Sequence, residues 1–207
     1  MVSPSEKILQ VLAEDIPIKD GRRARSQASR AKIIEAMVTL IVSGNMNPST
    51  ADIAKQAGVG LRSVFRHFDD KDEIYHAVDS LLVKTYRPVI EASYTADNWR
   101  LQLEELIERR CEVSEEIAPY RLYTLAARRY SEVIDQKYRR LHNNEKATLD
   151  AVLPNRINTS TSLGRALMIA MSFDTWRLLR MDEKLSAEAT VEAVKELVND
   201  ILSRSGH

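Results

Sequence analysis

The 207-residue sequence is poor in residues that cross-link or interrupt a fold. Its single cysteine, Cys111, excludes a disulfide within the chain and a cysteine-based metal site, and it suits a reducing cytoplasm. Six glycines and six prolines are few for this length, so we expect long regular elements. No run approaches the roughly 18 apolar residues of a membrane span, and the first residues lack the apolar core of a signal peptide. These absences predict a cytoplasmic protein.

Signatures of catalysis and metal binding are also missing. The four histidines show no metal-ligand spacing, and the sequence contains no Walker loop, dinucleotide fingerprint or G-x-S-x-G nucleophile motif. We therefore expect no metal, no cofactor and no enzymatic activity.

The formal net charge is zero, but the charges are unevenly distributed along the chain. From Lys19 to Lys71 there are ten Lys or Arg and five Asp or Glu, whereas the residues that follow carry a slight acidic excess. A basic segment on a neutral-to-acidic body indicates that this segment faces a polyanion.

Helical periodicity dominates the chain, and no alternating apolar-polar run predicts a strand. The expected helices are a short one near residues 2–12, one capped by Ser26 and ending before Gly44, short ones over about 49–57 and 61–67, a long one from about 70 that Pro88 kinks or ends, one from about Leu101, one that Pro119 begins, and others over 131–152, 160–179 and 186–202. The predicted fold class is therefore all-α.

Residues 49–68, with the sequence STADIAKQAGVGLRSVFRHF, have the pattern of a helix-turn-helix. Ser49 opens a capping box, Gly58 supplies the turn, and Ile53 and Val64 are spaced to fill the wedge between two short helices. The second of these helices fits a DNA major groove, with its first residues at the base edges. The residues that it would expose are Leu61, Arg62, Ser63 and Arg66.

This segment resembles the DNA-binding domain of the tetracycline-repressor (TetR) family. The matching residues are Ile53-Ala54, Ala57-Gly58-Val59, Phe65-Arg66-His67-Phe68 and Asp70-Lys71. The resemblance implies an N-terminal three-helix helix-turn-helix domain over residues 22–72, preceded by an extension (1–21). It further implies a C-terminal helical domain for effector binding and dimerisation over residues 73–207.

The sequence departs from the family pattern in the second short helix. Gly60 replaces the usual Ser cap, which weakens that cap by a few tenths of a kcal/mol. Phe65 replaces the usual Tyr, and Leu61 stands where a polar or basic residue is common. Arg62 replaces a small residue and can grip guanine O6 and N7, so we expect Arg62 and Ser63 to carry base specificity.

By resemblance, other residues meet the DNA backbone: Ser49, Phe65, His67 and Lys71. Helix N-termini at Ser49 and Lys71 would also present free N–H groups to phosphate. Arg22, Arg23 and Arg25 have two open interpretations. They form either an arm along DNA, for example in the minor groove, or a solvated tail.

The segment 166–173 is apolar nearly all round, so it must be covered on more than one side. A second copy of the chain is the simplest partner, and the resemblance implies a homodimer formed through the last two large helices. A wholly intramolecular core is the alternative. The expected interface residues are Ile169, Phe173, Val194, Val198 and Ile201.

The resemblance also implies an effector pocket in the C-terminal domain, which binds a small molecule of unknown identity. The candidate lining residues are Trp99, Tyr123, Tyr130, Met168, Met171, Thr175 and Trp176, each of which can equally be plain core.

Together these features predict a ligand-responsive transcriptional repressor that acts as a homodimer on a pseudo-palindromic operator in double-stranded DNA. Two alternatives stay open. One is a helical interaction protein whose helix-turn-helix does not bind DNA, and the other is an all-α enzyme that binds a small molecule.

Overall fold

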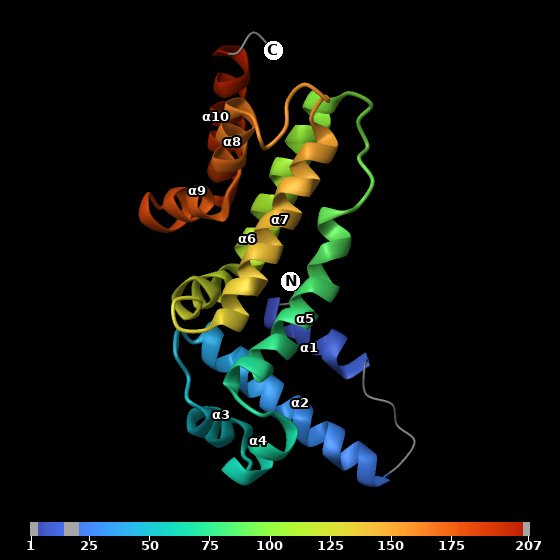
Figure 1. The fold of residues 1–207 in the computed structure, drawn as a ribbon, viewed down its shortest axis with the longest axis vertical. Helices are drawn as coiled ribbons and strands as arrows, with labels where there is room; N and C mark the ends of the chain where they lie inside the picture. Colours follow the sequence, from blue (N-terminus) through green and yellow to red (C-terminus); the bar gives the residue numbers. More distant parts are fainter. Residues whose placement is uncertain (1–3, 15–20, 205–207) are drawn as a thin grey trace. The chain divides into compact units, whose positions relative to one another are not determined.

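The structure is a computed structural model that describes residues 4–14 and 21–204. These residues form helices joined by turns, with no β-strand among them, which confirms the predicted all-α fold (Figure 1). The elements are α1 (Pro4–Glu14), α2 (Gly21–Val42), α3 (Thr50–Ala57), α4 (Leu61–His67), α5 (Lys71–Ile90), α6 (Trp99–Ala127), α7 (Glu132–Val152), α8 (Ser162–Ala170), α9 (Phe173–Arg177), the π-helical turn η1 (Leu178–Asp182) and α10 (Ala187–Arg204).

The first helix of the helix-turn-helix region starts earlier than the sequence predicts. α2 begins at Gly21, so Ser26 lies inside the helix and does not cap it. The residues before Ser26 are mostly Arg and Ala, which favour helix and provide no break. The predicted end is confirmed, because α2 stops at Val42 and Gly44 adopts a φ of 87°.

α5 begins close to the predicted position, at a capping pattern. The backbone N–H of Glu73 donates to Asp70 Oδ1 at 2.8 Å, and the Glu73 carboxylate accepts from the backbone N–H of Asp69 at 2.7 Å. Pro88 lies inside α5, which continues for two more residues to Ile90. The proline therefore marks the end of this helix only approximately.

Two helix boundaries in the C-terminal half were predicted wrongly. α6 runs without a break through Pro119, where we predicted that a new helix begins. The buried neighbours Ala118 and Tyr120 hold the helix in place around the proline. The predicted helix over 160–179 is instead broken after Met171, because Ser172 Oγ accepts from the backbone N–H of Thr175 at 3.2 Å and caps a new helix.

The last two long helices follow the prediction more closely. α7 covers residues 132–152, and Ser131 Oγ accepts from the backbone N–H of Ile134 at 3.2 Å at its start. Ser186 Oγ accepts from the backbone N–H of Ala189 at 3.1 Å at the start of α10. The final helix therefore begins at the predicted position, with Ser186 as its cap.

The chain divides into two compact units, each with its own core. The first unit comprises Met1–Pro88 and Ile117–Tyr138, and the second comprises Val89–Glu116 and Arg139–His207. The core of the first unit includes Ile33, Met37, Ile41, Ile53, Val64, Phe68, Ile74, Val78 and Tyr123. The core of the second includes Leu103, Leu106, Leu149, Leu167, Phe173, Trp176, Val194, Val198 and Leu202.

Within residues 4–14 and 21–204, no helix is long and apolar enough to cross a membrane. No group of three or more His, Cys, Asp or Glu side chains in the same ranges could hold a metal ion.

Candidate nucleic-acid interface

Local hydrogen bonds fix the ends of α3. Ser49 Oγ accepts from the backbone N–H of Asp52 at 3.1 Å, and the backbone N–H of Ser49 donates to the Asp52 carboxylate at 2.9 Å. These hydrogen bonds from Ser49 hold the pKa of Asp52 below its ordinary value. At the other end, Gly58 adopts φ 64° and ψ 33°. The predicted capping box and glycine turn are both confirmed.

The inner faces of α3 and α4 belong to the core of the first unit. Ile53 and Val64 are fully buried, and Ala54 and Phe68 are nearly so. Figure 1 shows α3 and α4 packed together beside α2. Because Val64 and Phe68 point inwards, the opposite side of α4 is turned to solvent and carries Leu61, Arg62, Phe65 and Arg66.

The outward face of α4 combines cations with apolar side chains. Arg62 and Arg66 are exposed, and Leu61 and Phe65 are 45% and 51% exposed. Arg66 Nη2 donates to Ser63 Oγ at 3.2 Å, so these two side chains hold each other. Arg62 takes part in no hydrogen bond or ion pair with the described residues. Its guanidinium is therefore available to a ligand.

A cation from α2 lies beside the residue that ends α4. The guanidinium of Arg30, on α2, lies 4.5 Å from the centroid of the Phe68 ring. Burial, and then the charges of Arg66 and Arg30, lower the pKa of His67. His67 Nε2 is buried and has no hydrogen-bond partner among the described residues. The neutral imidazole is therefore the favoured form near neutral pH.

Lys71, the first residue of α5, connects two turns of the first unit. Its Nζ donates to Asn47 Oδ1 at 2.5 Å, and Asn47 belongs to the turn before α3. Neither Asn47 nor Arg30 was predicted from the sequence to belong to this region. No spacing signal reveals such contacts, because the partners lie far apart in the chain.

The arginine run before the helix-turn-helix is helical. Arg22, Arg23 and Arg25 lie in the first two turns of α2, so the backbone forms neither an extended arm nor an irregular tail. Arg25 is exposed. The side chains of Arg22 and Arg23 lie outside the described part of the structure.

The seven residues predicted to line an effector pocket are divided between the two units. Tyr123 belongs to the first unit, is fully buried, and its ring centroid lies 4.6 Å from that of Tyr75. Tyr130, in the same unit, is 91% exposed and cannot serve as a pocket wall in this structure. Trp99 is the first residue of α6 in the second unit.

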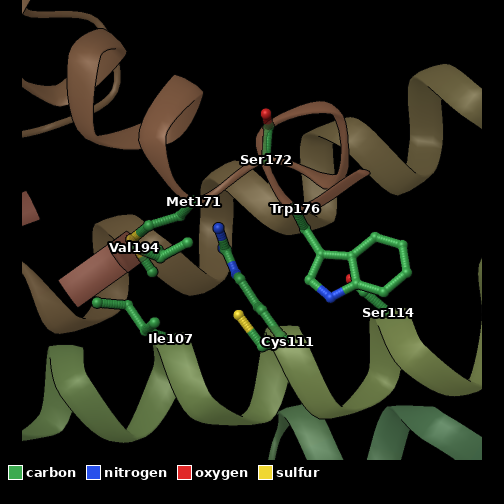
Figure 2. A pocket seen from close by; sticks show the side chains of 8 residues that line it. Ile107, Cys111, Ser114, Met171, Ser172, Trp176 and Val194 are labelled. Atoms are coloured by element: carbon green, nitrogen blue, oxygen red, sulfur yellow. The ribbon is translucent and has the colours of Figure 1, made fainter. Parts of the chain in front are cut away.

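Met171 and Trp176 do share a depression in the second unit (Figure 2). Burial raises the pKa of the neighbouring Cys111 thiol to about 11, and the Trp176 indole N–H is buried without a described partner. The depression has room for about one water molecule, whereas effector pockets enclose roughly 300–1,000 Å³. Its full lining is Ile107, Arg110, Cys111, Ser114, Met171, Ser172, Trp176 and Val194.

Two further pocket candidates lie beside this depression without lining it. Met168 is buried, and its sulfur lies 4.0 Å from Arg110 Nη1. Thr175 Oγ1 donates to the backbone oxygen of Ile169 at 2.6 Å, which spans the break between α8 and α9. Both side chains therefore have structural contacts within the second unit.

The residues predicted at a dimer interface differ in accessibility. Phe173, Val194 and Val198 are buried within the second unit of a single chain, and Ile201 is half-buried. Ile169 is 67% exposed. α8 and α10 lie side by side (Figure 1). Three of the five predicted residues thus already contribute to the chain's own core.

The fold and this interface define a helix-turn-helix DNA-binding protein. Residues 33–78, from within α2 into α5, match the family model described as "Bacterial regulatory proteins, tetR family". This match confirms the resemblance over the helix-turn-helix region and supports a TetR-type DNA-binding transcription regulator. Comparisons with curated proteins and with solved structures gave no match.

Proposed function

We propose that this regulator acts in the cytoplasm as a homodimer that represses transcription from a pseudo-palindromic operator until a small-molecule effector binds. The observation that carries the proposal is the outward face of α4. This short helix packs against α3, whose N-terminus is capped, and exposes Arg62 and Arg66. Such a helix enters the major groove and brings its first residues to the base edges.

Arg62 is the main base-reading residue in this proposal. A guanidinium donates two parallel hydrogen bonds to guanine O6 and N7, which discriminates against the wrong base by about 1–3 kcal/mol. The absence of a described partner for Arg62 supports this role. Ser63 is the second proposed reader, and Arg66, which donates to Ser63, positions that hydroxyl.

Backbone contacts hold α4 in register. We assign phosphate or sugar contacts to residues around both short helices and on the first turns of α2: Arg22, Arg23, Arg25, Ser49, Phe65, His67 and Lys71. The cations release counterions when they meet phosphate. The N-terminus of α5 adds backbone N–H groups at Lys71, whereas the backbone N–H of Ser49 already donates to the Asp52 carboxylate. Phe65 can offer only apolar contact to sugar or base.

The proposed dimer forms through α8 and α10. Ile169 is 67% exposed and Leu197 is 42% exposed, which leaves apolar surface on both helices for a second copy. Phe173, Val194 and Val198 support this surface from beneath, since they are buried in the same unit. Ile201, half-buried on α10, can contribute both to the dimer surface and to the core beneath it.

We propose residues 73–207 as the effector-binding and dimerisation domain, after the extension (1–21) and the DNA-binding domain (22–72). Met171 and Trp176 are the best-supported effector contacts. Because their depression has room for about one water molecule, an effector must select a more open state. Population shift between such states is then the means of regulation.

Contacts within the first unit provide a route from the C-terminal helices to α5. Ser131 Oγ donates to Asp72 Oδ2 at 2.5 Å, and Lys137 Nζ lies 2.6 Å from Asp79 Oδ2. Both carboxylates are on α5, and both partners lie at the start of α7 or just before it. A displacement of α7 would therefore act on the helix that follows α4.

Selection of duplexes from random DNA with the purified full chain tests this function. We expect an enriched inverted repeat with half-sites about 34–36 Å apart, or a multiple of that distance. The Arg62→Ala variant should select a degraded motif. Arg156→Ala, which removes an exposed arginine of the second unit, should select the wild-type motif. Absence of any enriched sequence would overturn the proposal, and a single asymmetric element would overturn the dimer.

A further inference from the structure

The outward face of α4 carries an apolar pair whose partner is not within the described chain. Phe65 is four positions after Leu61, so the two side chains lie on the same side of the helix, one turn apart. They are 45% and 51% exposed, whereas Val64 and Phe68 of the same segment are buried in the core. The core contacts of α4 are thus made by other residues.

The setting of this pair indicates the kind of partner that covers it. Arg62 and Arg66 follow Leu61 and Phe65 directly in the chain, and both are exposed. Arg30 lies a short way off, over the Phe68 ring. An apolar pair flanked by cations suits a polyanion that itself presents an apolar group.

The major groove of DNA presents one such group on its base edges. Guanine, adenine and cytosine show hydrogen-bond donors and acceptors there, and thymine adds the C5-methyl group. A leucine placed against a donor or acceptor would leave that group desolvated and unpaired, which is unfavourable. Against the methyl group, the same leucine removes apolar surface of both partners from water.

We propose that Leu61, with Phe65 one turn further along, recognises the C5-methyl group of a thymine in each operator half-site. This inference rests on the proposed function, since it requires α4 to lie in the major groove. Leu61, at the start of the helix, takes the position nearest the base edges. Phe65 packs beside it and closes the far side of the methyl group.

Deoxyuridine tests the inference because it keeps the hydrogen-bonding groups of thymine and lacks only the methyl group. Each thymine of the selected operator half-site is replaced in turn, and the Kd is measured by fluorescence anisotropy at fixed salt. At one position we expect binding to weaken about fourfold, the value of one buried methyl group. Replacement in both half-sites should weaken binding about 15-fold.

Variants assign the effect to the side chain. Leu61→Ala should bind the thymine and deoxyuridine operators almost equally, and Leu61→Met, which keeps an apolar side chain, should still discriminate. Leu101→Ala is the matched control, because Leu101 is 48% exposed and belongs to the second unit. It should discriminate as the wild type does. Circular dichroism checks that each variant is folded.

A methylated cytosine provides the converse test. Exchange of the sensitive T·A pair for C·G should weaken binding. With 5-methylcytosine at that position, the affinity should rise again by about fourfold, the value of the methyl group.

Three results would overturn the inference while leaving the proposed function intact: a half-site without thymine, an unchanged Kd with deoxyuridine at every position, or full discrimination by Leu61→Ala. Failure of the wild-type chain to bind any selected duplex would overturn both. The two failures are therefore distinguishable in one series of measurements.

Discussion

Residues of like charge have different environments on α4. Arg66 donates to Ser63 within its own helix, whereas the described contacts hold no partner for Arg62. Arg66 is held by its hydrogen bond and can position Ser63. Arg62 is not held by such a bond to any described residue, so its guanidinium can reach a base. This difference leads us to place base reading at Arg62 and not at Arg66.

The pKa of His67 predicts a pH-dependent stability. Burial, and then the charges of Arg66 and Arg30, lower this pKa in the folded chain. The unfolded chain therefore binds the proton more readily, so the free energy of unfolding is fully retained above about pH 6.5 and falls as the pH drops through that value. Urea denaturation at a series of pH values measures this loss.

His67→Gln should reduce that loss between about pH 7 and 5. His76→Gln, at an exposed position of α5, serves as the control and should keep the wild-type dependence. Identical pH dependence in wild type and His67→Gln would show that another group is responsible.

Lys71 predicts a change in the salt dependence of DNA binding. Lys71→Ala should weaken binding to all sequences similarly and reduce the slope of log K against log salt by about one per subunit, because one fewer counterion is released. Asn47→Ala removes the hydrogen bond to Lys71 Nζ but keeps the cation, so its slope should match the wild type. An unchanged slope in Lys71→Ala would exclude a phosphate contact.

At the scale of the element, α4 starts without a side-chain cap. Gly60 has φ −69° and ψ 146°, an extended conformation open to any residue, and a Cβ there would meet nothing within 4 Å. Gly60→Ser should therefore raise the free energy of unfolding by a few tenths of a kcal/mol, measured by thermal denaturation.

Gly58→Ser is the contrasting variant for this prediction. Gly58 has a φ of 64°, which side chains other than glycine adopt with strain, so the substitution should destabilise the turn. A Gly60→Ser variant less stable than the wild type would contradict the capping account.

Elements whose signals are contiguous were predicted well from the sequence. The capping box of Ser49 with Asp52 and the left-handed Gly58 depend only on neighbouring residues, and both were identified correctly. Two helix boundaries in the C-terminal half were predicted wrongly. α6 continues through Pro119 between the buried neighbours Ala118 and Tyr120, and the new start at Ser172 comes from its cap on Thr175, which the apolar pattern of this segment does not reveal.

In the candidate site, too, some features could be predicted from the sequence and others could not. The exposed residues of α4 follow from helical periodicity once Val64 and Phe68 are assigned to the core. Contacts such as that of Lys71 with Asn47 join residues 24 positions apart and leave no periodic trace. The residue type of an aromatic side chain does not distinguish a pocket wall from core or surface, because tyrosines occupy core and surface alike, as Tyr123 and Tyr130 show.

At the scale of the whole molecule, the helix-turn-helix belongs to the same unit as residues 117–138. α5, α6 and α7 each contribute residues to both units. These shared helices are the covalent connection through which an event in the second unit can reach the first. Regulation by an effector requires such a connection.

Exposed apolar surface on α8 predicts the assembly state. Ile169→Glu should give a folded monomer that binds the operator poorly, because a charge would be buried in the interface and half of the DNA contacts are lost. Leu101→Glu is the control, since Leu101 is 48% exposed on α6 and should leave the dimer intact. Val198→Glu should instead unfold the chain, because Val198 is 2% exposed.

Analytical ultracentrifugation with circular dichroism separates these outcomes. A wild-type chain that remains monomeric at micromolar concentration would contradict the dimer, and the predicted operator symmetry with it.

The most direct test of sequence-specific reading by α4 compares Arg62→Ala with the wild type on two duplexes at one salt concentration. The duplexes are the selected operator and a scrambled sequence of equal length. We predict that Arg62→Ala loses about 1–3 kcal/mol of operator affinity per half-site, at one base pair of each, and binds the scrambled duplex almost as the wild type does. Equal losses on both duplexes would contradict the account, because Arg62 would then contact only the backbone.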